Sequence, residues 1–524
     1  MTVQGFVSKT FRMAILIGGC FVFQLAVLSF SDLSLMFGDD YLVVKHFSNL
    51  SFRENLELGL SETGQGKWRP LTYLTIALMS NVCGFSQMRW IAVSAIMIAL
   101  LIWVFYTVAK HVQRTFGILS TRILFISLVF ILFEPSTWYN FGSPFAIMEV
   151  GAACCLLLGV LKLVESSSAC GPKVVAPSLW LIGAVLFHER YLIPVFAILI
   201  FLLLWSRDRK YSRTKFLERV SGRLNHSIET HDENSLSAQY FRFQSFFLSA
   251  LTLIYIYARS SLEGSSLITT GGLGGVSAWS FDWIGLRPLW WIFFMTSGSG
   301  QVWIFDPLES YALPSNIARL GVSLLGFSLV MIALTIVALN RSAIRRICAD
   351  KTILLSLASF LSLGIPSSLV AEWLEPRWWW STRLVVVLFI FWSVDLAMNK
   401  NSYFVRNRKL AVKSPVRHSL LGLIAIVCVA SSTALGWLDL KSFYGLRQDS
   451  AAAFEDVLEI GELRPEGHLV LLRSEIYSDD VLQWFFGYGG VFREFSELNV
   501  FVGVRDCERG VECSEVLVGA NKDE

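Results

Sequence analysis

Long apolar segments separated by polar loops dominate the first 437 residues of the chain. A helix needs about 20 mostly apolar residues to cross the hydrocarbon core of a bilayer, and shorter helices can cross where neighbouring helices support them. The pattern therefore predicts an all-α polytopic membrane protein with about 11 transmembrane helices. The predicted spans are 12–30, 88–109, 119–134, 144–165, 175–188, 190–205, 243–260, 317–339, 352–371, 383–399 and 419–437.

Two further apolar segments, 71–85 and 288–305, are ambiguous, because the first is short and polar residues interrupt the second. Short basic loops stay in the cytoplasm, and with the N-terminus on the same side an even number of spans must separate successive basic loops. We therefore expect both ambiguous segments to lie at the outer membrane face and the C-terminus to be extracytoplasmic. The four basic loops begin at Lys110, Arg207, Arg341 and Lys400.

The end of the chain has the composition of a soluble protein. Two short apolar runs, 469–472 and 500–504, predict strands, and 451–460 favours a helix. Residues 438–524 are therefore expected to form a small extracytoplasmic α/β or α+β domain. It follows a transmembrane domain, 1–437.

Composition narrows the class of protein. The chain has 524 residues, of which 54% are hydrophobic and 16% charged, and its mean hydropathy is +0.55. The net charge of +3 comes with Lys and Arg clustered between apolar runs, which favours orientation signals over a nucleic-acid surface. The nine cysteines show no CxxC or Cys/His spacing typical of a zinc site. We expect neither a nucleic-acid partner nor a bound metal.

Unusual polar residues collect on the predicted outer side. Charged groups at membrane depth are costly unless they face a cavity or a partner, so this one-sided concentration predicts a cleft at the outer face. Asp39 and Asp40 follow the first span and begin a first external loop, 31–87, that we expect to contain juxtamembrane helices. One of the two carboxylates could act as a general base on a hydroxyl group while the other tunes it. The alternative is a helix-end anchor exposed to water.

Three other polar groups are candidates for the same cleft. Lys67-Trp68-Arg69-Pro70 offers two cations for a phosphate and an aromatic ring for a sugar, or else a headgroup anchor. His188-Glu189-Arg190 interrupts an apolar region, and its alternative role is an ion pair that caps two helices. In Glu375-Pro376-Arg377, the arginine is suited to a lipid-linked phosphate, with Arg383 as a second candidate and snorkelling as its alternative. The tryptophans after Arg377 are typical of interfacial anchors.

These residues resemble the motifs of the GT-C class of polytopic glycosyltransferases, which includes protein mannosyltransferases and lipid A aminoarabinose transferases. Asp39-Asp40-Tyr41, with His46 nearby, is similar to the acidic motif of that class. Glu375-Pro376-Arg377-Trp378 resembles its late arginine-aromatic motif, with Trp where Tyr is commoner. The resemblance covers the architecture of residues 1–437. No Trp-Trp-Asp motif is present, which argues against an oligosaccharyltransferase.

The resemblance implies an inverting glycosyltransferase of the cell inner (plasma) membrane. It would move a hexosyl or pentosyl group from a polyprenyl-phosphate donor to a glycan, lipid or protein acceptor of the cell envelope, at the outer face. No cofactor is required, although two acids beside a phosphate could bind a divalent cation. The implied roles are catalytic base for Asp39 or Asp40, donor-phosphate binding for Arg377, Lys67, Arg69 and Arg190, and orientation of the acceptor for His188, Glu189, Tyr41, His46 and Glu375.

Three other functions remain open from the sequence. An envelope lipid or polysaccharide transporter or flippase would favour polar residues through the bilayer centre and an inverted repeat. An O-antigen-type polymerase or ligase would depend on arginines in a large external loop. In a non-catalytic assembly subunit, the external tail would be the functional part. The acids at one face and the lack of a visible repeat favour the glycosyltransferase.

Overall fold

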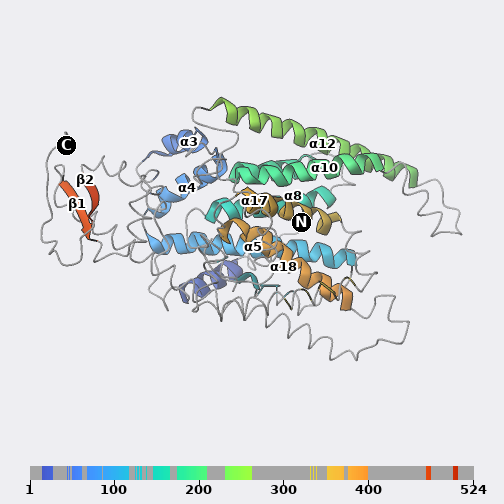
Figure 1. Cartoon of the computed structure of the whole chain (residues 1–524), viewed down its shortest axis with the longest axis horizontal. Helices are drawn as coiled ribbons and strands as arrows, with labels where there is room; N and C mark the ends of the chain where they lie inside the picture. The colour runs from blue at the N-terminus through green and yellow to red at the C-terminus, as the bar shows by residue number, and fades with distance from the viewer. Residues whose placement is uncertain are drawn as a thin grey trace.

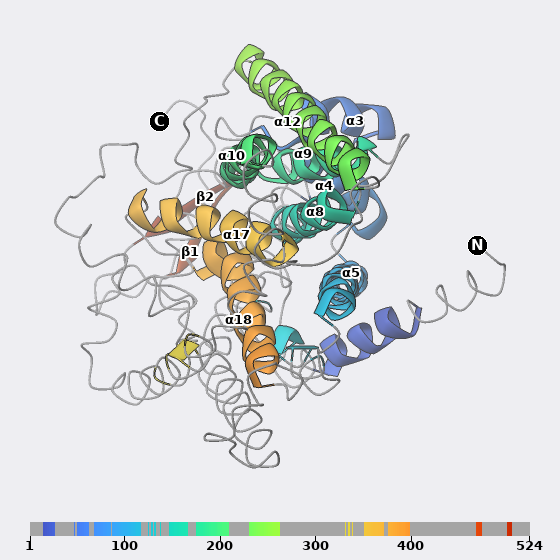
Figure 2. The same ribbon diagram turned by 90° about the vertical axis from the view of Figure 1, so that its right-hand side faces the viewer.

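The computed structural model shows a bundle of helices whose long members run along one axis (Figure 1). The end-on view shows α8 among α5, α9, α10 and α17 (Figure 2). The structure describes residues 14–26, 50–61, 68–84, 86–116, 146–165, 174–208, 230–262, 351–370, 376–398, 468–473 and 500–505, and single positions at 44, 47, 124, 127–128, 130–132, 137, 328, 331, 334–335 and 338.

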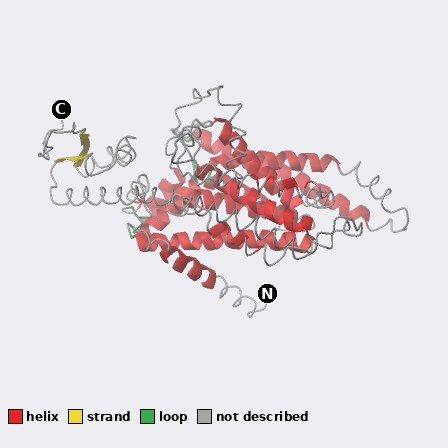
Figure 3. Ribbon diagram, turned by 60° about the horizontal axis from the view of Figure 1, so that its bottom comes forward, coloured by secondary structure: helices red, strands yellow, loops and turns green. Residues whose placement is uncertain are grey.

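Helices make up nearly all of the described part of the chain, coloured red in Figure 3. The all-α character predicted for the first 437 residues is confirmed wherever the structure describes them. The elements are a helix at Ala14–Ala26, α3 (Phe52–Ser61), α4 (Pro70–Cys83), α5 (Gln87–Phe116), α8 (Ala146–Glu165), α9 (Ala176–Phe187), the 3-10 helix η4 (Glu189–Tyr191), α10 (Leu192–Asp208), α12 (Thr230–Ser261), α17 (Lys351–Val370) and α18 (Pro376–Met398).

Within the described residues, three helical segments are long and apolar enough to cross a membrane: Met88–Gln113, Ala146–Glu165 and Tyr240–Ser261. They coincide with predicted spans. Other predicted spans are helical but shorter in their apolar part, as in Ala176–Phe187 and Lys351–Gly364. The total of about 11 spans is not tested, because 119–134 and 317–339 are described only at isolated positions and 288–305 and 419–437 lie outside the described residues.

The ambiguous segment 71–85 forms α4, a helix of 14 residues. At 1.5 Å per residue such a helix is about 21 Å long, less than the roughly 30 Å of a hydrocarbon core. Its length therefore agrees with the prediction that this segment is not a full span. The preceding α3 packs closely on α4, since a Cβ added at Gly59 would lie 2.9 Å from the Cα of Leu74.

Large apolar side chains point outward from α12. Phe246 and Tyr257 are each 75% exposed, and Leu253 and Ile254 lie on the same face of the helix. The neighbouring α10 exposes Ile193, Phe196, Ile200, Leu203 and Leu204 at similar spacing. Water would penalise such a surface, whereas hydrocarbon chains would not, so it is typical of a protein that faces lipid.

The centre of the bundle is α8, in which nearly every described side chain is buried. It packs against α9 through glycines: a Cβ added at Gly151 would lie 2.8 Å from the Phe187 ring, and one added at Gly159 would lie 2.7 Å from Cδ2 of Leu181. Small residues let two helices approach closely, which is how membrane helices gain packing energy without a hydrophobic driving force.

The bundle has two chemically different ends. At one end, His111 lies 3.6 Å from Glu165, and Lys351 lies over the ring of Phe241 with its Nζ 5.2 Å from the centroid. Lys110 and Lys351 belong to loops predicted to be on the same side, and the contacts place both at this end. The opposite end contains the start of α8 and the residues between α9 and α10.

The two strands predicted in the tail are confirmed as β1 (His468–Arg473) and β2 (Val500–Arg505). They pair in parallel, with Leu469 opposite Phe501 and Leu471 opposite Gly503. Parallel neighbours cannot be joined by a tight hairpin turn, and 26 residues, 474–499, separate the two strands in the sequence. The predicted helix 451–460 lies outside the described residues, and the assignment of 438–524 as a separate domain remains a prediction.

Candidate functional site

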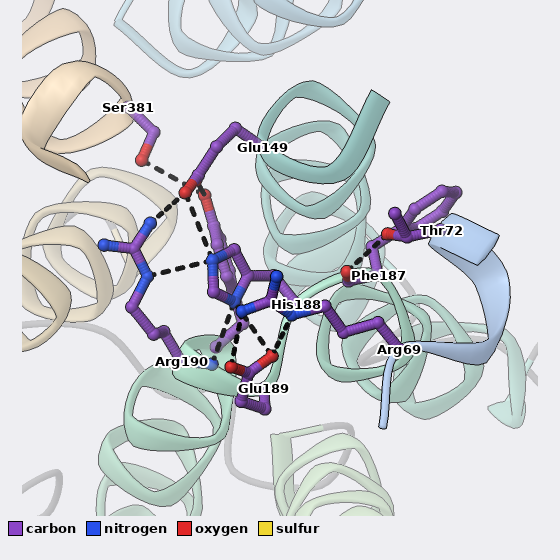
Figure 4. Close-up of polar contacts among 9 residues, drawn as sticks. Arg69, Thr72, Glu149, Phe187, His188, Glu189, Arg190 and Ser381 are labelled. Atoms are coloured by element: carbon purple, nitrogen blue, oxygen red, sulfur yellow. Dashed lines mark hydrogen bonds and ion pairs between the residues drawn. The ribbon is translucent and has the colours of Figure 1, made fainter. Parts of the chain in front are cut away.

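The candidate site is a cluster of charged side chains at the end of the bundle where α8 begins (Figure 4). Four parts of the chain meet there: the residues just before α4, the first turns of α8, the residues between α9 and α10, and the first turns of α18. We call His188–Tyr191 the α9–α10 junction.

The junction forms because the helical chain is interrupted at His188. This residue has an extended backbone, with φ −151° and ψ 119°, directly after the last turn of α9. Its Nδ1 accepts a hydrogen bond from the backbone N–H of Arg190 at 3.3 Å, which caps the short helix η4. The break therefore presents three consecutive polar side chains at one end of the bundle.

Arg69 and Glu189 form a two-pronged ion pair. Nε of Arg69 donates to Oε2 at 2.5 Å, and its Nη2 donates to Oε1 at 2.6 Å. The two side chains are only 11% and 10% exposed. This geometry matches a guanidinium to a carboxylate and is the strongest form of side-chain ion pair. It joins the first loop to the α9–α10 junction.

Glu149 is the carboxylate on the other side of the cluster, and only 3% of the residue is exposed. It accepts a hydrogen bond from Nη2 of Arg190, and its Oε1 lies 3.3 Å from Nε2 of His188. Its Oε2 lies 3.5 Å from the hydroxyl of Tyr191, which also donates to Oγ of Ser381 at 3.1 Å. Glu149 therefore links α8 to the junction and, through Tyr191, to α18.

The imidazole of His188 lies between the two carboxylates. Its Nδ1 is 3.3 Å from Glu189 and its Nε2 is 3.3 Å from Glu149, while Nε of Arg190 is 3.1 Å from the same Nε2. A neutral imidazole has one donor and one acceptor nitrogen. The cap on η4 needs Nδ1 as an acceptor, which puts the proton on Nε2, facing Glu149. A proton on Nδ1 would instead face Glu189 and let Nε2 accept from Arg190, but it would remove the cap. The position of one proton thus links the two carboxylates.

The charges in the cluster are balanced, with two arginines and two glutamates around the histidine. Burial by itself would raise the pKa of Glu189, but the charge and hydrogen bonds of Arg69, joined by those of His188 when the imidazole is protonated, outweigh it and hold that pKa well below its ordinary value. Burial opposes the charge of Arg69 as well, yet Glu189 keeps the pKa of Arg69 raised. The carboxylate of Glu189 is therefore ionised at neutral pH.

An aromatic pair lies beside the Arg69–Glu189 ion pair. Trp68 and Tyr255 stack with their ring centroids 5.3 Å apart, and the Tyr255 hydroxyl donates to the backbone oxygen of Trp68 at 3.3 Å. Thr72 adds a bond of 2.6 Å to the backbone oxygen of Phe187. Contacts of Trp68, Arg69 and Thr72 thus fix the segment that begins α4 in place. The ring of Trp68 packs against Tyr255 of the same chain.

The structure brings together four of the residues predicted for the site: Arg69, His188, Glu189 and Arg190. The backbone of Arg377 lies in α18, four residues before Ser381. Arg383, in the same helix, is buried. The remaining predicted residues, Asp39, Asp40, Tyr41, His46, Lys67 and Glu375, lie outside the described residues.

Glu149 and Tyr191 are members of the cluster that the motifs do not identify. Glu149 is the one acid in the apolar run before Glu165, and a lone acid inside a predicted membrane helix is a signal of function that the sequence does contain. Tyr191 directly follows His188-Glu189-Arg190 in the sequence. Its partner Ser381 is 190 positions away, so no local pattern could indicate the pair.

Among the described residues, no group of three or more His, Cys, Asp or Glu side chains is placed to hold a metal ion. The chemistry available in the described part of the cluster is therefore that of cations, carboxylates and one imidazole. Such a cluster could bind an anionic group, or it could hold together the segments of the chain that contribute to it.

Comparison with protein-family models and with curated protein sequences finds no match to this chain.

Proposed function

We propose that the protein is an inverting membrane glycosyltransferase of the GT-C type, which moves a sugar from a polyprenyl-phosphate donor to an acceptor of the cell envelope. The observation that carries the proposal is the buried cluster of Arg69, Glu189, His188, Glu149 and Arg190 at one end of a lipid-facing helical bundle. An enzyme of this type needs such a charged end, since its donor is anchored in the bilayer and its leaving group is a phosphate. The motif resemblance of Asp39-Asp40-Tyr41 and Glu375-Pro376-Arg377-Trp378 supports the same assignment.

The proposed reaction is a single displacement at the anomeric carbon. The acceptor hydroxyl attacks, its proton passes to Asp39 or Asp40, and the bond between the anomeric carbon and the phosphate oxygen breaks with inversion. Polyprenyl phosphate leaves with its negative charge, which cations stabilise. Arg377, Lys67, Arg69 and Arg190 are the candidate cations. The reaction needs no cofactor, and it takes place at the outer face of the inner membrane.

The acceptor side would be formed by polar groups of the same end of the bundle. His188 and Glu189 lie in the cluster, and Tyr41, His46 and Glu375 belong to the motifs. The tail, 438–524, would form an extracytoplasmic domain above this end.

The test is a comparison of cell-envelope glycans and lipids by mass spectrometry. A strain that lacks the gene is complemented with the wild-type chain, with Asp39→Asn or with Asp40→Asn. We expect the deletion to lose one modification and to accumulate its polyprenyl-phosphate sugar. One of the two variants should behave in the same way, because loss of a general base slows transfer about 100-fold to 10,000-fold.

The matched control is Glu57→Gln, which removes a charge from the same loop. Glu57 is exposed and pairs only at the surface with Arg53, so this variant should restore the modification. Restoration by both aspartate variants at normal protein levels would refute the catalytic assignment. Accumulation of a donor on the cytoplasmic side only would indicate a flippase instead, and short glycan chains would indicate a polymerase.

A further inference from the structure

Arg69 is a candidate for the donor phosphate from its sequence, but its contacts suit another role. Both prongs of its guanidinium are bonded to the two oxygens of Glu189, at 2.5 and 2.6 Å. The same N–H groups cannot donate to a phosphate in this arrangement. A phosphate bound by two parallel N–H donors on this edge of the guanidinium would have to displace Glu189.

Separation of the pair would be unfavourable. Both side chains are about 90% buried, and the carboxylate of Glu189 would lose its main cationic partner while remaining out of water. The low pKa of Glu189 agrees with a carboxylate that stays charged and paired.

The neighbours of Arg69 also bind the start of α4 to helices around the junction. Thr72 bonds to the backbone oxygen of Phe187 at the end of α9, and Trp68 stacks on Tyr255 of α12. Within residues 68–72, three successive contacts therefore fasten the segment that begins α4 to the helices around the junction. Arg69 provides the charged contact among them.

We propose that Arg69 is a positioning residue that, through Glu189, fastens the first external loop to the α9–α10 junction. The role in catalysis rests on the proposed function, because this loop also carries Asp39 and Asp40. Fastening fixes one end of the loop relative to Glu149 and α18. Donor-phosphate binding then falls to the other candidate cations, Arg377, Lys67 and Arg190.

Hydrogen exchange measured by mass spectrometry on the full chain in lipid nanodiscs tests the fastening without any assay of activity. The amides to follow are Tyr73, which bonds to the carbonyl of Arg69, and His188 and Tyr191, which lie in the junction. We expect Arg69→Ala and Glu189→Gln to speed exchange about tenfold or more in peptides from both segments. Arg53→Ala, which breaks an exposed pair in the same loop, should change neither.

A charge exchange separates this role from a general loss of stability. Arg69→Glu should expose both segments, and the double variant Arg69→Glu with Glu189→Arg should recover protection. If Arg69→Ala or Glu189→Gln folds with normal yield and leaves exchange at both segments unchanged, the proposal is wrong. Arg69→Lys keeps the positive charge but can make only one of the two hydrogen bonds, so it should give an intermediate rate of exchange. It replaces Arg69→Ala in the test if the alanine variant does not fold.

Transfer kinetics distinguish a positioning residue from a phosphate ligand. Fastening predicts that Glu189→Gln and Arg69→Ala both lower kcat at least about tenfold, with a smaller change in KM for the donor. If Arg69 instead binds phosphate, Glu189→Gln frees its guanidinium and should lower that KM, which would overturn the proposal. A wild-type chain without transferase activity would refute the proposed function, while the exchange experiment would still decide whether Arg69 fastens the loop.

Discussion

The hydroxyl of Tyr191 donates a hydrogen bond to Oγ of Ser381 at 3.1 Å, although 190 positions separate the two residues. This bond connects the α9–α10 junction to α18, and the same hydroxyl lies 3.5 Å from Glu149 in α8. Arg377 precedes Ser381 by four residues in α18, so its Cα lies about 6 Å away along the helix axis. The charged cluster is therefore physically continuous with the helix that carries the late arginine motif.

Replacement of Tyr191 by Phe should weaken this connection. The change removes the hydroxyl and keeps the buried ring, so Ser381 loses its donor and Glu149 loses a polar neighbour, while packing is preserved. We expect the free energy of unfolding to fall by about 0.5–1.5 kcal/mol, measured by titration with sodium dodecyl sulfate in mixed micelles. Tyr257→Phe, at an exposed position of α12, is the control and should leave the midpoint unchanged. Equal midpoints for the two variants would contradict the assigned bond.

Glu149→Gln should have a larger effect. The substitution keeps the shape of the side chain but removes the negative charge that faces Arg190 and His188. Loss of one partner from a buried pair costs about 3–5 kcal/mol, and the partial exposure of Arg190 favours the lower end. Glu165→Gln, in the last turn of the same helix, should cost about 0–1 kcal/mol because its partner Lys162 is exposed. The same detergent titration measures both, and similar losses would show that Glu149 is not an essential partner.

Much of this fold could be predicted because the signals are local. The apolar runs that form α5, α8 and α12 are long, and the two strands of the tail are short apolar runs in a polar segment. Charge patterns also predicted that Arg69, His188, Glu189 and Arg190 share an end of the bundle. His188-Glu189-Arg190 could be identified as candidate site residues for the same reason, since these three charged or polar residues interrupt an otherwise apolar region.

The pairings within the cluster could not be predicted. Arg69 meets Glu189 across 120 positions, and Arg190 meets Glu149 across 41. Hydrophobic periodicity shows which residues face inward but not which helices are neighbours. The sequence also leaves the role of Arg69 open, because a guanidinium suits a phosphate and a carboxylate equally well until its neighbours are known.

The glycines of α8 provide a test of the packing against α9. A Cβ at Gly151 would lie 2.8 Å from two atoms of the Phe187 ring, so Gly151→Ala should force the ring or the helix to move. We expect a loss of about 1–3 kcal/mol. At Gly183 in α9, the nearest atom to an added Cβ is Sγ of Cys155 at 3.6 Å, an ordinary contact. Gly183→Ala should therefore be neutral or stabilising by up to about 1 kcal/mol. Equal losses in thermal unfolding would refute this packing.

The Arg69–Glu189 pair predicts a specific dependence of stability on pH. Glu189 belongs to η4, between two helices, and its pKa in the folded protein is well below the ordinary value of 4.5. A carboxylate with a lowered pKa contributes stability that is fully present above its unfolded pKa. That contribution is lost as the pH falls through the lower, folded pKa. Arg69 stays charged throughout this range because its pKa is raised.

Wild type and Glu189→Gln should therefore differ most in thermal stability at neutral pH, and the difference should be nearly constant from about pH 6 to 8. Below about pH 4.5 the wild-type chain loses the contribution of its ionised carboxylate, so the two melting curves should converge. Glu57→Gln, at an exposed position of the same loop, should follow the wild-type curve at every pH. A gap between wild type and Glu189→Gln that stays constant down to pH 3, or widens there, would mean that the stabilising carboxylate is not Glu189.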